Sequence, residues 1–315
     1  MTTVLITGIG GDIAQSVAKL VRQRFPDFRL VGTDMGVEHG GRLFVDGLRI
    51  VPAAASPDYT AALLKIVEAE RVDHVVPMSE PELEVLLPLI ENGEHTSWVT
   101  AGPKVIAAGI DKLETAQTLA HLGVPTPWTS AVATGQPREL PCILKERFGS
   151  GSRGVYIVKD EEDLRYLAPR HPDGVFQQLL GTPDAEVTCA VYRTADERVA
   201  TLQMRRRLVG GFTGWAETIA DHRVAAMCEQ VAEGLQLRGA MNVQLRLTSD
   251  GPRIFEINPR YSSTVLMRAG IGFTDVAWAF DELQGKPVTF PGIRTGTVIV
   301  RTQGAAVIDG SSNTG

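Results

Sequence analysis

The chain has 315 residues, of which 43% are hydrophobic and 22% charged, and its formal net charge is −6. Such a composition indicates a globular protein of two or three domains. The negative net charge, with a single cationic run at 205–207, argues against a nucleic-acid partner. The start of the chain lacks a signal-peptide pattern and no apolar run has the length of a membrane span, so we expect a cytoplasmic protein that does not cross a membrane.

The N-terminal part of the chain alternates short apolar strands with amphipathic helices. This rhythm is typical of βαβ units, in which helices cover both faces of a parallel sheet. It predicts a Rossmann-like α/β domain over residues 1–102. The expected strands are 4–7, 30–33, 74–77 and 98–100, and the expected helices are 14–24, 59–69 and 82–90.

The pattern changes to α+β after a helix that begins at Asp111 and Lys112 and a proline-containing connector at 123–127. We expect a small subdomain over 103–175 and a C-terminal subdomain over 176–315. The expected strands are 142–145, 155–158, 176–178, 186–192 and 198–203, followed by an irregular stretch at 209–218 and a hairpin within 239–260; the expected helices are 161–167, 223–235 and 273–283.

A glycine-rich turn at Gly8, Gly10 and Gly11 follows the first strand, and Asp34 ends the second strand. The pattern is similar to the dinucleotide-binding fingerprint, in which an acidic residue at that place binds a ribose. Ile13 stands where the fingerprint has its third glycine, which disfavours close packing of helix and strand around a pyrophosphate. A tight turn into a helix needs small residues whatever it binds, so an NAD(P)-dependent reductase is the less favoured alternative.

A second glycine-rich loop follows the strand that ends at Lys145. Backbone N–H groups of such a loop can fold over phosphates while the lysine meets their charge. A flexible hairpin loop with a solvated lysine fits the same residues equally well. The loop residues that we assign to phosphate binding are Gly149, Ser150, Gly151, Ser152 and Gly154.

A hinge-like segment contains Gln177, Gln178, Leu179 and Leu180, and Glu186 follows it. An extended backbone of this kind can offer an N–H and a C=O to the edge of an adenine, with the leucines as apolar walls. A carboxylate shortly after it can accept a hydrogen bond from a ribose hydroxyl. Without further context, an ordinary strand and turn is the simpler interpretation.

The most informative pattern is the predicted hairpin, in which polar and apolar residues alternate with a period of two. A turn centred on Asp250 places Gln244 opposite Glu256, and Asn242 opposite Asn258. Opposed side chains on one face lie about 5 Å apart at Cβ. A carboxylate and amide oxygens that converge in this way suit a hard cation such as Mg²⁺. The alternative is the solvated outer face of an ordinary hairpin.

These motifs follow one another in a defined order: a lysine at a helix start, a lysine before a glycine loop, a glutamine and leucine hinge, and an E-x-N-x-R motif formed by Glu256, Asn258 and Arg260. The ordered set resembles the ATP-grasp superfamily over nearly the whole chain. It is most similar to compact proteins that resemble the synthetase halves of the carbamoyl phosphate synthetase large subunit. The resemblance implies an N-terminal α/β domain followed by a two-subdomain ATP-grasp fold that binds nucleotide between its subdomains.

The resemblance also implies roles in nucleotide binding. Lys112 and Lys145 would contact the phosphates of ATP under the glycine loop. The segment from Gln177 to Leu180 would line the adenine, and Glu186 would face the ribose. The N-terminal domain would help to form the site of the acceptor substrate.

For the metal, the resemblance implies that Glu256 and Asn258 hold Mg²⁺, or Mn²⁺ in its place, with Gln244 as a further or indirect ligand. Glu256 is then the only strong anionic ligand of the motif. Gln177 and Gln178 stand where many relatives carry an acidic hinge residue, which alters the contact to the adenine amino group and leaves backbone recognition intact.

The arginine run precedes a glycine-containing stretch that could reach the reacting end of a substrate. Neighbouring strand residues point to opposite faces, so Arg205 and Arg207 share one face and Arg206 takes the other. We assign Arg205 and Arg207, together with Arg260, to catalysis. The reason is that a guanidinium can clamp a carboxylate through two hydrogen bonds.

By resemblance the chain is an ADP-forming carbon–nitrogen ligase. A small-molecule carboxylate would take the γ-phosphoryl group of ATP, and an amine or similar nucleophile would then displace phosphate. Lys112, Lys145 and Arg260 suit a reaction that depends on positioning and charge neutralisation. A non-catalytic ATP-binding regulatory protein is the alternative, against which the retention of these residues argues. A homodimer is compatible with the sequence, which does not fix the oligomeric state.

Overall fold

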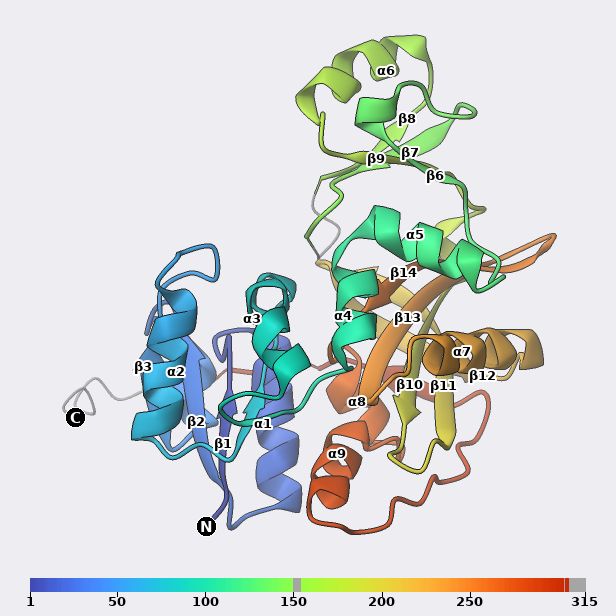
Figure 1. The fold of residues 1–315 in the computed structure, drawn as a ribbon. Coiled ribbons are helices and arrows are strands. Elements are labelled where there is room, and N and C mark those ends of the chain that lie inside the picture. Colours follow the sequence, from blue (N-terminus) through green and yellow to red (C-terminus); the bar gives the residue numbers. More distant parts are fainter. Residues whose placement is uncertain (150–153, 303, 306–315) are drawn as a thin grey trace.

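The computed structural model describes residues 1–149, 154–302 and 304–305, so the phosphate contacts predicted for Ser150, Gly151 and Ser152 lie outside the described residues. The N-terminal domain contains a parallel sheet, as the sequence predicts, and its five strands have the order β3-β2-β1-β4-β5 (Figure 1). Its elements are β1 (Thr3–Ile6), α1 (Asp12–Arg24), β2 (Arg29–Asp34), the 3-10 helix η1 (Gly40–Leu43), β3 (Gly47–Ile50), α2 (Tyr59–Ala69), β4 (His74–Val76), α3 (Glu80–Asn92) and β5 (Ser97–Trp98). The sequence pattern misses β3 because this edge strand is only partly buried and lacks an apolar run.

Two helices, α4 (Pro103–Ile110) and α5 (Lys112–His121), connect this domain to a small subdomain. The small subdomain is an antiparallel four-stranded sheet in the order β6-β9-β7-β8, with α6 packed on it, and it stands apart from the rest of the molecule in Figure 1. Its last strand ends at Gln178, so the small subdomain extends beyond the predicted boundary at 175. Its elements are β6 (Thr129–Ala131), η2 (Val132–Thr134), β7 (Cys142–Lys145), β8 (Val155–Val158), α6 (Glu161–Leu167), η3 (Ala168–Arg170) and β9 (Val175–Gln178).

The C-terminal part is built on an antiparallel six-stranded sheet in the order β14-β13-β10-β11-β12-β15. The stretch 209–218, expected to be irregular, is instead largely strand β12, which forms a hairpin with β11. Gly210 and Gly211 have φ of 59° and 84° and form the turn, which explains why a glycine-rich stretch is compatible with a hairpin. The elements are η4 (Pro183–Ala185), β10 (Glu186–Arg193), β11 (Val199–Val209), β12 (Phe212–Ile219), α7 (His222–Gly234), β13 (Gly239–Thr248), β14 (Gly251–Asn258), α8 (Val265–Ala269), α9 (Asp275–Leu283) and β15 (Val298–Val300).

The hairpin of β13 and β14 has the predicted register. Gln244 pairs with Glu256, and Asn242 pairs with Asn258. Leu245 pairs with Ile254, so Phe255 is an extra residue on β14, as in a β-bulge. The bulge brings the Phe255 side chain to the cavity described below, although strict alternation predicts it on the opposite face.

Hydrophobic packing joins the N-terminal domain to the C-terminal part. One cluster of buried residues runs from Ile6 and Val17 in the N-terminal domain to Val265 and Phe280 in the C-terminal part. The small subdomain has a separate core around Leu144 and Phe176. The small subdomain therefore has a hydrophobic core of its own. None of the described helices is long and apolar enough to span a membrane.

Candidate nucleotide site

A cavity of about 530 Å³ lies where the three parts of the molecule meet. The small sheet, the large sheet and the first turns of α1 and α5 all contribute to its lining. Most of the residues predicted to bind nucleotide or metal, and one of the three predicted catalytic arginines, line this cavity. Those that do are Lys112, Lys145, Gly149, Gln177, Gln178, Leu180, Glu186, Gln244, Glu256, Asn258 and Arg260.

Lys145 is the last residue of β7 and only 5% exposed. Its Nζ donates to Gln177 Oε1 at 2.9 Å, and Gln177 Nε2 donates in turn to Thr129 Oγ1 at 3.0 Å. Burial lowers the pKa of Lys145 to about 8; the charge of Glu256 opposes this shift, and that of Lys112 adds to it. A lysine whose nearest partner is a neutral amide is ready to accept an anion as its counter-ion.

Lys112 lies in the first turn of α5, which Asp111 caps by accepting a hydrogen bond from the Leu113 N–H at 2.9 Å. Its Nζ donates to the Gly149 carbonyl at 2.6 Å. Arg147 binds both carboxylate oxygens of Asp111 at 2.8 and 2.7 Å. These contacts hold Arg147 and Gly149 next to the N-terminus of α5, and Lys112, Lys145 and Gly149 all line the cavity.

The side chains of Glu256 and Asn258 have no hydrogen-bond partner within the described residues. The Glu256 carboxylate makes no hydrogen bond or ion pair within the described residues, although it lies near enough to Lys145 and Glu80 to act on the pKa of each. The Asn258 side chain is 4% exposed, and its amide nitrogen is buried without a partner. No group of three or more His, Cys, Asp or Glu side chains suited to a metal occurs in the described parts of the chain. A cation here would therefore need oxygen ligands from a bound phosphate in addition to those from the protein, which suits Mg²⁺.

The three arginines at 205–207 point to two different faces of strand β11. Arg206 is buried and lines the cavity, whereas Arg205 and Arg207 are exposed on the other face of β11. Arg207 lies over the ring of Trp215, with 5.0 Å between the guanidinium carbon and the ring centroid. The predicted alternation of the three arginines is correct, but the face assigned to catalysis is not the one that lines the cavity.

Arg206 engages two of the predicted contact residues. It donates to Glu186 Oε1 at 2.8 and 2.5 Å and to Gln244 Oε1 at 2.9 Å. A second arginine, Arg246, lies 3.5 Å from Glu186 Oε2 and donates to the Leu180 carbonyl at 2.5 Å. Gln244 is thus not a free metal ligand, and Glu186 reaches a ribose only in competition with two guanidinium groups.

The hinge segment is only partly oriented as predicted. Leu180 lines the cavity, but Leu179 does not. The Gln178 N–H donates to the Trp128 carbonyl at 3.0 Å, and its side chain contacts Glu139 at 3.3 Å. Gly154, predicted to cover the phosphates, does not line the cavity either.

Arg260, which follows strand β14, links the C-terminal part to the N-terminal domain. Its Nη2 donates to Glu80 Oε1 at 2.9 Å, and the two side chains are 12% and 8% exposed. Burial raises the pKa of Glu80; the charge of Arg260 opposes this shift and that of Glu256 adds to it. Glu80 therefore lies within electrostatic reach of the cavity, and a carboxylate with a raised pKa in such a place is typical of functional sites.

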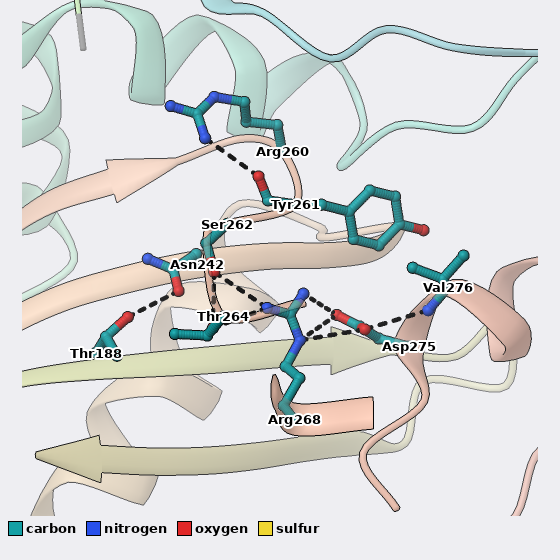
Figure 2. Close-up of polar contacts among 9 residues, drawn as sticks. All are labelled: Thr188, Asn242, Arg260, Tyr261, Ser262, Thr264, Arg268, Asp275 and Val276. Atoms are coloured by element: carbon teal, nitrogen blue, oxygen red, sulfur yellow. Dashed lines mark hydrogen bonds and ion pairs between the residues drawn. The ribbon is translucent and has the colours of Figure 1, made fainter. Parts of the chain in front are cut away.

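A buried arginine supports the loop that carries Arg260 (Figure 2). Arg268, with a side chain 1% exposed, donates to Ser262 Oγ at 3.0 Å and to Thr264 Oγ1 at 2.9 Å. It also pairs with Asp275, with a shortest distance of 2.5 Å. A buried pair with additional hydrogen bonds fixes the loop between β14 and α8.

Side chains of the protein fill the space next to the N-terminal glycine turn, where a dinucleotide would bind. The Gly10 N–H donates to Asp34 Oδ2 at 2.8 Å, and a Cβ on Gly10 would lie 2.8 Å from the His39 ring. The acid that would bind a ribose in a dinucleotide enzyme therefore binds the turn. The NAD(P)-dependent reductase gains no support from this geometry.

Sequence reasoning misses several residues of the cavity: Ile13, Ile143, Glu146, Val155, Arg206, Leu208, Gly211, Phe212, Arg246, Phe255, Ser262 and Ser263. It also misses Glu80, for which a signal exists. Glu80 begins a helix that directly follows the carboxyl end of parallel strand β4, the edge at which α/β sheets bind ligands.

Two family models match the chain. The ATP-grasp domain matches residues 110–264, and the PylC-like N-terminal domain matches residues 4–98. The C-terminal section of the carbamoyl phosphate synthase large chain of Methanopyrus kandleri is 24% identical over 230 residues, which are 64% of this chain and 42% of that protein. The chain thus spans less than half of this curated relative.

Solved structures share the fold. The N5-carboxyaminoimidazole ribonucleotide synthetase of Thermus thermophilus has a TM-score of 0.76 at 19% identity, covering 94% of this chain and 82% of that one. The biotin carboxylase domain of Hydrogenobacter thermophilus 2-oxoglutarate carboxylase, solved with MgADP and bicarbonate, has a TM-score of 0.74 at 16% identity, covering 94% and 73%. By its motifs and its matched domains, the chain contains an ATP-grasp domain over residues 110–264, preceded by a PylC-like N-terminal domain.

Proposed function

We propose that the chain is an ATP-dependent, ADP-forming ligase. It transfers the γ-phosphoryl group of ATP to the carboxylate of a small molecule, and an amine or similar nucleophile then attacks the acyl phosphate and releases phosphate. The observation that carries the proposal is the convergence of five side chains on one cavity: Lys112, Lys145, Glu256, Asn258 and Arg260. A protein that only binds ATP does not need the whole set.

The chain's own residues fit ATP and Mg²⁺. Glu256 and Asn258 would hold the ion, or Mn²⁺ in its place, because neither side chain has a hydrogen-bond partner in the described parts of the chain. When bound, the ion neutralises the charge that develops on phosphate oxygens. The MgADP bound to the related biotin carboxylase domain supports this choice of nucleotide and metal.

The cationic residues position the phosphates and the acceptor. Lys145 and Lys112 line the cavity, and Lys112 also binds the Gly149 carbonyl, so both can balance the charge of a triphosphate. Arg260 follows strand β14, lines the cavity and binds Glu80 of the N-terminal domain. A guanidinium in that place can hold a carboxylate or the phosphoryl group in transfer. Arg206 and Arg246 contact Glu186, Gln244 and the Leu180 carbonyl, so Arg206, and not Arg205 or Arg207, is the arginine of the run that would contact the nucleotide.

Nucleotide affinity should fall as the pH rises through about 8. Burial lowers the pKa of Lys145 from 10.5 to about 8, so above this pH the lysine of the free protein is a neutral amine. Phosphate favours the cation, and binding must then take up a proton, which costs up to about tenfold in affinity per pH unit. Below this pH the lysine is already charged and the affinity should be flat. Titration calorimetry with MgADP in buffers of different ionisation enthalpy measures both the affinity and the proton uptake.

The Gln177→Glu variant is the informative partner in this experiment. A carboxylate in place of the amide 2.9 Å from the lysine would raise the pKa of Lys145 and move the fall in affinity to higher pH. Lys159→Ala, which removes an exposed lysine outside the cavity, is the control. An affinity independent of pH in the unaltered protein, or an unchanged profile in Gln177→Glu, would contradict this account of Lys145.

The reaction itself is tested by a screen of carboxylic acids with MgATP and hydroxylamine. The acid that the enzyme activates should give a hydroxamate, with ADP and phosphate released in step. MgATP should also raise the Tm, since a ligand of the native state stabilises it. Phosphate release that no acid increases, together with no hydroxamate, would favour the non-catalytic alternative. We also propose that the protein is a cytoplasmic homodimer. Light scattering of the purified protein tests the oligomeric state.

A further inference from the structure

The C-terminal segment returns to the cavity along the edge of the large sheet. Strand β15 pairs with β12, with Val300 opposite Trp215. The next residue, Arg301, donates its backbone N–H to the Gly214 carbonyl at 2.9 Å. The pairing therefore fixes where the Arg301 side chain begins.

The Arg301 guanidinium binds three segments that are distant in the sequence. Its Nε donates to the Thr213 carbonyl at 3.0 Å, its Nη2 to the Ser263 carbonyl, and its Nη1 to Asp12 Oδ2 at 2.6 Å. The guanidinium carbon also lies 5.7 Å from the centroid of the Phe212 ring. Each of the three nitrogens thus has a protein partner, and the side chain is 20% exposed.

Each of these three segments supplies a neighbouring residue to the cavity wall. Phe212 precedes Thr213, Ile13 follows Asp12, and Ser263 itself lines the cavity. Among the described residues that line the cavity, Ile13 is the one from the N-terminal domain. Arg301 therefore ties together three segments of the cavity wall, one of which comes from the N-terminal domain. Ile13, which stands where a dinucleotide fingerprint has glycine, is part of this wall.

We propose that Arg301 is a positioning residue for the acceptor end of the site. Its planar fork holds Ile13, Phe212 and Ser263 in one arrangement and so sets the affinity for the carboxylic acid, which it does not itself touch. A lysine keeps the charge but cannot span three acceptors with the same geometry. The role in acid binding rests on the proposed function, whereas the tethering of the three segments does not.

The tethering is tested by hydrogen–deuterium exchange on the whole chain. In Arg301→Lys, peptides covering 210–214 and 260–264 should exchange faster, while strand β7 should be unchanged, because only the tethered segments lose contacts. Arg294→Lys is the matched control, since Arg294 lies in the same C-terminal segment, is exposed and has no side-chain partner within the described residues. Asp12→Asn is a milder second variant that removes only the charge of the N-terminal tether, and it should change the same peptides less.

Kinetic measurements distinguish a positioning role of Arg301 from a general effect on stability. In Arg301→Lys the KM for the acid found by the hydroxamate screen should rise on the order of tenfold or more, as expected for a displaced binding wall, while the affinity for MgADP stays within about twofold. Unchanged exchange in both segments, faster exchange throughout the chain, or a loss confined to MgADP affinity would overturn the proposal. Faster exchange at 210–214 and 260–264 in a protein that activates no acid would support the tethering and show instead that the proposed function is wrong.

Discussion

Glu256→Gln should fold normally, lose on the order of a hundredfold or more in turnover, and need more Mg²⁺. Glu256 is the one carboxylate of the E-x-N-x-R motif. It has no hydrogen-bond or ion-pair partner within the described residues, so its charge is available to a metal ion. The bond to a hard cation depends on that charge, so an amide of the same shape keeps the packing and weakens the metal site. The measurement is the initial rate of ADP release over a Mg²⁺ titration at saturating ATP.

Asp250→Asn is the matched control for this variant. Asp250 is an exposed carboxylate at the turn of the same hairpin, and its loss should leave the Mg²⁺ dependence unchanged. Thermal unfolding of both variants shows whether the fold is intact. Near-normal turnover of Glu256→Gln at ordinary Mg²⁺ would remove Glu256 from the metal site. A matching loss in Asp250→Asn would mean that the hairpin, and not the carboxylate, is responsible.

Local patterns predict the parts of this protein that depend on local chemistry. The period-two alternation and the turn at Asp250 predict the register that pairs Gln244 with Glu256. The rhythm of strands and helices predicts the parallel sheet, and Lys112 and Lys145 come to one cavity as expected. Each of these features follows from residues that are close in the sequence or from the order of motifs.

Contacts between distant segments are what the sequence alone does not predict. In the sequence Arg206 is one of three adjacent arginines, and it is the buried face of β11 that turns it towards Glu186. Phe255 enters the cavity through a bulge, and no alternation pattern encodes a bulge. Arg301 is separated from Asp12 by almost the whole chain, so their pairing depends on how the domains pack.

Arg260→Lys should bind MgATP within a few-fold of the unaltered protein and lose on the order of a hundredfold in kcat, comparable to the loss of one preorganised transition-state donor. Arg260 follows strand β14 and lines the cavity. It can therefore interact with the negative charge that shifts as the phosphoryl group moves from ADP to the acceptor. Lysine keeps the charge beside Glu80 and loses the planar fork. Lysine is preferable to alanine here, because alanine would leave the buried Glu80 carboxylate without a cation and destabilise the fold.

The same preparation must supply both numbers for this variant, MgATP affinity from equilibrium binding and kcat from initial ADP release. Arg238→Lys is the control, since it changes an exposed guanidinium outside the cavity and should leave both unaltered. Glu80→Gln tests whether Glu80 acts only by holding Arg260 in place. If Glu80 only holds Arg260 in place, Glu80→Gln should lower kcat less than Arg260→Lys does, because the amide oxygen can still accept a hydrogen bond. A large loss of MgATP affinity with kcat preserved in Arg260→Lys would make Arg260 a ground-state ligand of the nucleotide, and its assignment to the transfer step would then be wrong.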